Sequence, residues 1–311
     1  MALFVATAAQ AQNYPIKPVR LIVPFAAGGP VDAVGRLIGP KLAEAWGQQV
    51  VIDNRAGANS IVGSEVAMRA APDGYTLALV SAGFAINVSL YPKLPYDTLK
   101  DFTHIATVAF GPGILVTHPS LPARNLKELI ALAKARPGTL TFGSSGAGAP
   151  TSHLGMELLK VLANVNMIHV PYKSMAPALT DILGGQIHMG MPTINVTVQH
   201  VRSGRLRAIG VSSATRSPAM PEVPPLAEAG MPGYEANNWT LLIGPAGVPS
   251  AIAEKISADS ARAVAAPELR ERFAAVGMEA RSIPHAEITP FVRAEIAKWG
   301  KVVRASGAKP E

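Results

Sequence analysis

The feature that most constrains the fold of this chain is a repeated alternation of short apolar runs, glycine-rich turns and amphipathic stretches. The first occurrence is a β-branched run at residues 20–25, followed by a turn at 26–29 and a helical pattern over 30–46. Apolar runs of this length, each followed by a helix, predict buried strands in parallel sheets whose faces are covered by helices. The sequence therefore predicts an α/β protein.

The alternation runs through the chain in two series, which predicts two doubly wound α/β domains joined by a hinge. The expected strands of the first series lie at residues 20–25, 49–54, 75–81 and 113–118. Those of the second series lie at residues 140–143, 167–172, 187–191 and 206–212. A helix is expected at residues 151–162, directly after the first strand of the second series.

The end of the chain adds one strand at residues 239–243 and three amphipathic helices at 249–264, 267–276 and 285–303. We expect residues 12–112 and 237–311 to form a discontinuous first domain. Residues 113–236 then form the second domain.

The composition suits two packed domains, because 49% of the 311 residues are hydrophobic and 16% are charged, which argues against disorder. The lack of cysteine in the sequence excludes disulfides, thiolate catalysis and cysteine-based metal sites. The net charge is +7, but Lys and Arg are scattered and the sequence contains no nucleic-acid-binding motif. No nucleic acid is expected as a partner, and the basic surface gives weak support for an anionic ligand.

Residues 1–11, MALFVATAAQA, form a small apolar stretch that ends in an A-x-A cleavage pattern. We interpret this stretch as the remnant of an export signal; the alternative is a frayed apolar start. Later apolar runs in the sequence stay short of the ~18 residues that a membrane-spanning helix needs. The sequence thus predicts a periplasmic protein.

Two loops follow the first strand of each series and precede a helix, which is where open α/β sheets bind ligands. In the loop at residues 24–32, Gly28 and Gly29 allow a tight turn and are expected to expose backbone amides. The loop at residues 143–153 offers small residues and hydroxyls, among them Ser144 and Gly148. Together the loops are expected to hold a carboxylate by amides and hydroxyls, although each alone also fits an ordinary turn or helix cap.

Three side chains in these loops have both a structural and a functional interpretation. Asp32 fits the first turn of a helix, where the macrodipole favours a negative charge; the alternative is a role in orienting waters or meeting a ligand amino group. His153 is a candidate to hydrogen-bond a ligand carboxylate and gain positive charge, or it is satisfied locally. Phe25 either covers one face of a flat ligand or belongs to the core.

Enzyme signatures are missing from these loops. The glycines match neither a P-loop nor G-x-G-x-x-G, and residues 143–147 depart from G-x-S-x-G at the last position. No metal-binding motif is present in the sequence, so neither a metal nor a cofactor is expected. An alternative is a serine-type hydrolase with Ser145 as nucleophile and His153 as base, which requires the two side chains within hydrogen-bond reach and a third orienting group.

At these loops the chain resembles the Bug family, the extracytoplasmic binding proteins of tripartite tricarboxylate transporters. The resemblance is carried by residues 14–32, 51–58 (VIDNRAGA), 72–77 (PDGYTL), 143–154, 171–186 and 244–249. Two departures stand out: Ser174 replaces a common Gly, and residues 188–193 (HMGMPT) replace a stretch that is usually acidic and aromatic. These departures affect the identity of the substrate most.

The resemblance implies a type II periplasmic-binding-protein fold that closes on a carboxylate held between its two domains, partly through water. By position it carries ligand-binding roles to Phe25, Gly29, Asp32, Ser145, Gly146, Thr151 and His153. Ser81 and Asn87, expected in the loop after the third strand, become further wall residues. Thr193 and Asn195 are expected to face the far end of the ligand.

The expected function is therefore that of a non-enzymatic solute-binding protein for a dicarboxylate, tricarboxylate or aromatic carboxylate. The implied partners are the membrane subunits of a tripartite transporter, and the protein is expected to be a monomer. Besides the hydrolase, a periplasmic sensor that presents its ligand to a receptor kinase remains an alternative.

Overall fold

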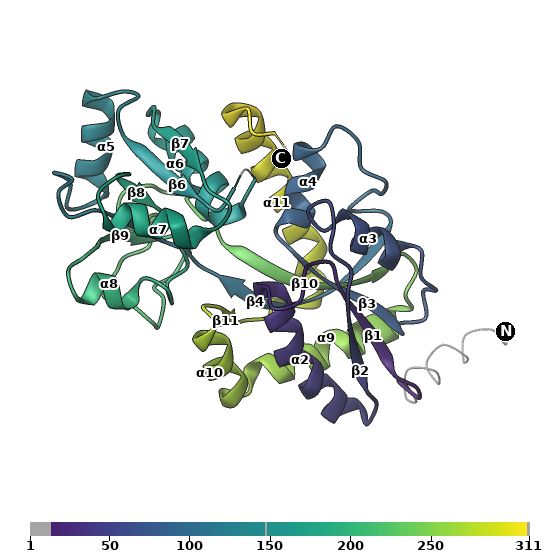
Figure 1. Ribbon diagram of the computed structural model, residues 1–311. Helices are drawn as coiled ribbons and strands as arrows, with labels where there is room; N and C mark the ends of the chain where they lie inside the picture. The colour runs from purple at the N-terminus through teal and green to yellow at the C-terminus, as the bar shows by residue number, and fades with distance from the viewer. Residues whose placement is uncertain (1–13, 147, 310–311) are drawn as a thin grey trace. The chain divides into compact units, whose positions relative to one another are not determined.

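The computed structural model describes residues 14–146 and 148–309 (Figure 1), and the expected export-signal remnant at residues 1–11 lies outside them. The chain divides into two compact units. The first contains the described residues up to Phe110 together with Trp239–Ala297, and the second contains Gly111–Asn238 and the described residues from Lys298 onward. The sequence-based division assigned residues 298–311 to the first domain, whereas α11 (His285–Ser306) continues from the first unit into the second.

The first unit contains a six-stranded sheet in the order β11-β4-β10-β3-β1-β2. Its strands are β1 (Val19–Val23), β2 (Val50–Asn54), β3 (Thr76–Ser81), β4 (Phe102–Gly111), β10 (Asn238–Pro245) and β11 (Glu279–Ala280). Strands β2, β1 and β3 are parallel, but β10 is antiparallel to β3 and β11 is antiparallel to β4. The expected parallel sheet is thus a mixed one, because only β1, β2 and β3 follow one another through crossover helices, which parallel neighbours require.

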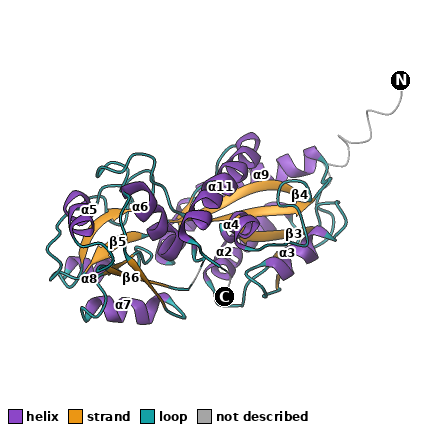
Figure 2. Cartoon of the chain, turned by 90° about the horizontal axis from the view of Figure 1, so that it is seen from above, coloured by secondary structure: helices purple, strands orange, loops and turns teal. Residues whose placement is uncertain are grey.

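Helices α2 (Pro30–Trp46), α9 (Ser250–Ala265) and α10 (Pro267–Ala275) share one hydrophobic core with this sheet. The first unit also contains α3 (Ile61–Met68) and α4 (Gly83–Leu90) (Figure 2). Helix α2 begins at a proline, whose fixed φ suits the first helical position. Its Val34 packs with Leu21 of β1, Ile256 of α9 and Phe273 of α10 in the same buried cluster.

The second unit contains a five-stranded sheet in the order β7-β6-β8-β5-β9. Its strands are β5 (Ile114–Thr117), β6 (Thr141–Ser144), β7 (Ile168–Pro171), β8 (Met189–Gly190) and β9 (Arg207–Val211). Strands β7, β6 and β8 are parallel, and β5 is antiparallel to both β8 and β9. This sheet is also mixed, contrary to the expected parallel arrangement.

The helices of the second unit are α5 (Leu126–Ala135), a π-helix η1 (Pro150–Gly155), α6 (Met156–Ala163), α7 (Met175–Leu183) and α8 (Val198–Arg202). Ile114 and Val116 of β5 pack with Ile182 of α7 and Val211 of β9 in the core. The helix expected at residues 151–162 is therefore two elements, because its first turns are wound as a π-helix.

Candidate ligand-binding loops

Three loops of the first unit lie at one edge of its sheet. They follow β1, β2 and β3, which are adjacent and parallel, so their carboxyl ends meet there. The first two loops are tied together, because the Arg55 N–H donates to the Val23 carbonyl (2.8 Å) and the Asn54 side chain donates to the Phe25 carbonyl (3.1 Å). This edge is where open α/β sheets bind ligands.

Asp32, in the first turn of α2, is buried with 1% of its surface exposed. Its carboxylate accepts hydrogen bonds from the Gly28 N–H (2.8 Å), the Arg36 guanidinium (2.8 Å) and the Asn54 amide (2.9 Å). Burial alone would raise the pKa of Asp32, but the bonds from Arg36, Gly28 and Asn54 outweigh it and hold this pKa below its usual value. Asp32 therefore organises the loop, in line with its structural interpretation.

Gly28 and Gly29 were expected to expose their backbone amides, and the structure places these amides differently. Gly28 has a φ of +81° and donates to Asp32, while the Gly29 N–H donates to the Ala26 carbonyl at 3.3 Å. Both amides are thus engaged inside the loop. Ala26 and Ala27 are exposed, and within the described chain their N–H groups have no hydrogen-bond partner. These two amides, rather than those of the glycines, are the donors that the loop leaves available.

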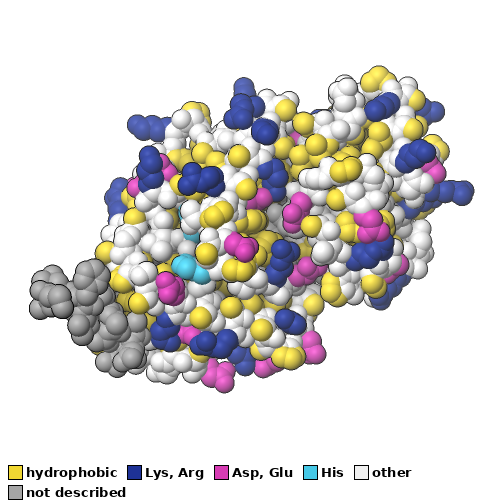
Figure 3. Space-filling view, turned by 180° about the vertical axis from the view of Figure 1, so that it is seen from behind, with side chains coloured by type: hydrophobic (Ala, Val, Ile, Leu, Met, Phe, Trp, Pro, Cys, Tyr) yellow, Lys and Arg dark blue, Asp and Glu magenta, His cyan; other side chains and the backbone are white. Residues whose placement is uncertain are grey.

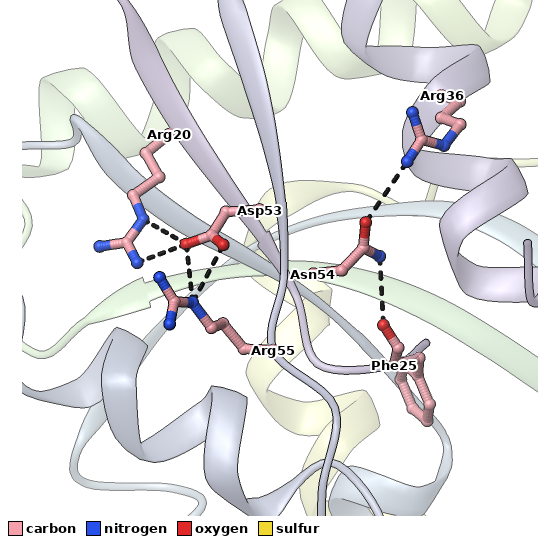
Figure 4. Close-up of polar contacts among 6 residues, drawn as sticks. All are labelled: Arg20, Phe25, Arg36, Asp53, Asn54 and Arg55. Carbon is pink, nitrogen blue, oxygen red and sulfur yellow. Dashed lines mark hydrogen bonds and ion pairs between the residues drawn. The ribbon is translucent and has the colours of Figure 1, made fainter. Parts of the chain in front are cut away.

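Phe25 is half-buried and packs against the hydrophobic core of the first unit, which supports its core interpretation. Figure 4 shows Asn54 between Arg36 and Phe25. Asn54 links the Arg36 guanidinium to the Phe25 carbonyl.

Asp53, the next residue towards the start of β2, lies between Arg20 and Arg55 (Figure 4). Partial burial would raise the pKa of Asp53, but hydrogen bonds from these two arginines lower it below its usual value. This charged cluster fixes the end of β2.

The third loop leads from Ser81, the last residue of β3, into α4. Asn87 lies inside α4 and is fully buried, with both ends of its side chain hydrogen-bonded to Asn59. The sequence placed Asn87 in the loop after the third strand, whereas the structure places it in α4; its contact with a ligand stays a prediction. Because residues 83–90 are buried on nearly all sides, the sequence there lacks the polar face that identifies a helix.

In the second unit, the loop after β6 runs into the π-helix η1. Ser144 is buried, and its hydroxyl lies 2.6 Å from the His169 Nε2 atom. Ser145 is exposed, and its hydroxyl lies 3.0 Å from that of Ser152. π-helical turns are rare and are found mostly at functional sites, which agrees with a binding role for this loop.

His153 is buried in η1, and its Nδ1 accepts a hydrogen bond from the Gly148 N–H at 2.9 Å. Its ring stacks on that of His169 with 4.0 Å between centroids. Burial, the neighbouring His169 and Lys160 lower the pKa of His153 to about 4. The His153 imidazole is therefore uncharged at neutral pH, in line with the interpretation that it is satisfied locally.

The described residues also do not form the nucleophile–base arrangement that the hydrolase alternative requires. The Ser145 hydroxyl pairs with Ser152, while the Nδ1 of His153 is occupied by the Gly148 amide. The serine–histidine contact that does form joins the buried Ser144 to His169. A nucleophile needs access to substrate and a base beside it, and Ser145 and His153 do not provide this arrangement.

Gly146, Thr151 and Thr193 lie around the same edge of the second sheet, where β6 and β8 end. Thr193 is exposed and forms an isolated bridge with Gly113. A Cβ at Gly113 would lie 2.4 Å from the Thr151 methyl, so this glycine permits a close approach. The Thr151 hydroxyl is buried without a hydrogen-bond partner in the described chain.

Two α/β units, each with small-residue loops at the carboxyl ends of parallel strands, are typical of the class of two-domain solute-binding proteins. Residues 34–308 match the family model described as "Tripartite tricarboxylate transporter family receptor", and the chain belongs to this family. The family consists of receptors rather than enzymes. Solved members include periplasmic binding proteins, with the two-domain type II fold that the resemblance implied.

Individual relatives match along nearly the whole chain. Protein BugT of Bordetella pertussis is 36% identical over 316 residues, covering 99% of this chain and 97% of its own length. The structure of R. palustris Rpa4515 with adipate has a TM-score of 0.76 and 33% identity, covering 96% of this chain and all of that one. MatC from Rhodopseudomonas palustris with bound malate has a TM-score of 0.72 and 32% identity, covering 93% of this chain and all of that one.

In the part of the chain that the structure describes, no helix is both long and apolar enough to cross a membrane. On the face drawn in Figure 3, Lys and Arg side chains are dispersed among Asp and Glu rather than gathered in one patch.

Proposed function

We propose that this protein is a periplasmic receptor that binds a small carboxylate and delivers it to the membrane subunits of a tripartite transporter. The observation that carries the proposal is the kind of donor that the loops offer. Ala26 and Ala27 are exposed and their amides have no hydrogen-bond partner among the described residues. Ser145 is exposed and adds a hydroxyl, while the nearby charge of Asp32 is already paired with Arg36. Exposed neutral donors at strand ends suit a carboxylate oxygen.

Relatives support the same ligand class. Rpa4515 and MatC, each about one third identical to this chain over more than nine tenths of it, were solved with adipate and with malate. Because neutral donors contribute less per contact than an Arg–carboxylate pair, we expect selectivity among acids to come from the shape of the site and from individual polar side chains.

The test is a titration of the purified protein with acids that differ in length and substitution: succinate, malate, aspartate, citrate, adipate and benzoate. A ligand present at ~100 times its Kd raises the free energy of unfolding by about 2.7 kcal/mol, which thermal unfolding detects. The matched control is the diamide of the strongest acid, which keeps its shape without its charge. Equal binding of acid and diamide would contradict carboxylate recognition, and so would the absence of any acid that binds.

The transport role and the monomeric state need separate measurements. Cells that lack this receptor are expected to lose uptake of the labelled acid and to regain it on complementation with the wild-type gene. Normal uptake without the receptor would contradict the proposed delivery. Light scattering of the purified protein, with and without ligand, is expected to give the mass of one chain.

A further inference from the structure

The loop between β2 and α3 holds an unusual backbone. Ala58, Asn59 and Ser60 have φ values of 44°, 50° and 75°, so three successive residues with side chains lie in the left-handed region. Residues other than glycine avoid this region, and asparagine tolerates it best. Such conformations persist where the surrounding structure imposes them, and they cluster at functional sites.

Asn87 of α4 imposes the conformation of this loop. Its Nδ2 donates to the Asn59 carbonyl at 2.8 Å, and its Oδ1 accepts from the Asn59 Nδ2 at 2.8 Å. Asn87 is fully buried, so water does not compete for these bonds. A backbone carbonyl only accepts hydrogen bonds, which requires the Asn87 amino group to face it. The carbonyl oxygen of Asn87 then faces Asn59, and Asn59 must present its own amino group there.

This arrangement determines where the Asn59 Oδ1 atom lies. A Cβ at Gly83 would lie 3.6 Å from this oxygen and 3.5 Å from the Ser81 hydroxyl, so both groups border the space above Gly83. Asn59 is exposed, and among the described residues nothing donates a hydrogen bond to its Oδ1. The loop therefore holds an acceptor without a partner beside a serine hydroxyl, at the strand edge where the ligand is proposed to bind.

The two groups together suit a particular kind of acid. The Ser81 hydroxyl can donate to a carboxylate oxygen, whereas the Asn59 Oδ1 requires a donor. A carboxylate with a hydroxyl or an ammonium group on the adjacent carbon supplies both kinds of partner. A plain dicarboxylate leaves the Asn59 acceptor without a partner, which weakens binding.

We infer that Asn59 contacts the ligand and selects acids with a hydrogen-bond donor beside the carboxylate, and that Asn87 is a positioning residue for Asn59. This inference rests on the proposed function, because it concerns the same ligand site. It distinguishes malate and aspartate from succinate, three C4 diacids that differ only in the group on the second carbon.

Calorimetric titration with these three acids tests the inference. The wild-type protein is expected to bind malate or aspartate at least about tenfold more tightly than succinate, and the comparison of malate with aspartate separates a hydroxyl from an ammonium ligand. Asn59→Gly removes the carboxamide but favours the left-handed backbone. We expect it to reduce the preference to about twofold or less, with succinate bound at least as tightly as by the wild type and the fold intact.

Ala58→Gly is the matched control, since it relaxes the adjacent left-handed residue and removes only an exposed methyl group. It is expected to keep the wild-type preference. Gly83→Ala places a methyl beside Ser81 and Asn59 and is expected to weaken binding of all three acids. Asn87→Ala is expected to lose the preference as Asn59→Gly does, an effect that a purely structural role for Asn87 does not produce.

The inference is overturned if Asn59→Gly keeps the wild-type preference for malate or aspartate over succinate, or if the wild-type protein binds the three acids equally. Carboxylate binding stands in either case. If a longer acid binds best, the same comparison is made with that acid and its 2-hydroxy and 2-amino derivatives. If no acid binds the wild-type protein, the proposed function fails and the inference fails with it.

Discussion

The loops after β1 and β6 are held by the same kind of hydrogen bond, from a glycine amide to a side chain, but the two acceptors differ in chemistry. In each, a glycine with positive φ donates its amide to a buried side chain in the first turns of the following helix. Gly28 donates to Asp32 four residues later, in an α-helix, and Gly148 donates to His153 five residues later, in a π-helix. The longer spacing matches the wider π-helical turn. A helix-start loop can thus be closed by an ionised carboxylate or by a neutral imidazole.

The difference in acceptor predicts different sensitivities. Asp32 is charged and depends on Arg36 and Asn54 to stay so. His153 is neutral and loses its acceptor atom when it is protonated. The first loop should therefore depend on its charged partners and the second on pH.

The largest expected effect is that of Asp32→Ala. It removes one buried acceptor from three donors, and we expect it to lower the free energy of unfolding by about 3–4 kcal/mol. Chemical denaturation measures the loss. Asp53→Ala is the matched control at the same sheet edge, because the Asp53 side chain is 22% exposed and that of Asp32 only 2%; it should lower stability by about 1 kcal/mol or less. Equal losses in the two variants would show that burial does not set the strength of these contacts.

The second prediction concerns pH. The pKa of His153 is about 4 in the folded protein and about 6.5 in the unfolded chain. Between these values the unfolded state binds more protons, so stability is full above pH 6.5 and falls by about 3 kcal/mol as pH decreases to 4. The stabilisation that Asp32 contributes is lost at a lower pH than that of His153. Because the pKa of Asp32 is depressed in the folded protein, this stabilisation is present above about pH 4 and is lost as pH falls further.

His153→Asn separates the two contributions, because the asparagine Oδ1 can still accept from the Gly148 amide without titrating. Denaturation of this variant at pH 7, 5 and 4 should show a flatter profile than that of the wild type. Some slope remains, since burial also lowers the pKa of His104 and His188. An unchanged slope would mean that His153 does not produce the acid sensitivity.

Local patterns predicted much of the fold. The expected helix at residues 30–46 coincides with α2, because a proline start and a 3.6-residue apolar period mark it. The sequence did not predict β4, whose interior includes the polar His104 and Thr107. The contacts that satisfy His104 come from Thr98 and Thr289, and no local pattern reveals them.

In the binding loops, too, local sequence patterns do not reveal the contacts made by residues that are distant in sequence. Glycine and serine content located both loops, since those residue types mark tight turns and hydroxyl donors. The partners that organise them are distant in sequence: Asn54 lies 22 residues from Asp32, and His169 lies 25 residues from Ser144. Which amides are occupied and which are available depends on those partners, so sequence reasoning named the glycines where the structure leaves Ala26 and Ala27 available.

The smallest predicted effect compares two adjacent serines of the second loop. Ser144 is buried against His169, so Ser144→Ala should lower the free energy of unfolding by about 1–2 kcal/mol. Ser145 is exposed, and Ser145→Ala should change stability by no more than about 0.5 kcal/mol while weakening carboxylate binding about three- to tenfold, the loss of one hydrogen bond. Denaturation and titration of both variants measure the two effects. If Ser144→Ala weakened binding at unchanged stability and Ser145→Ala affected neither, the assignment of one serine to the fold and the other to the ligand would be reversed.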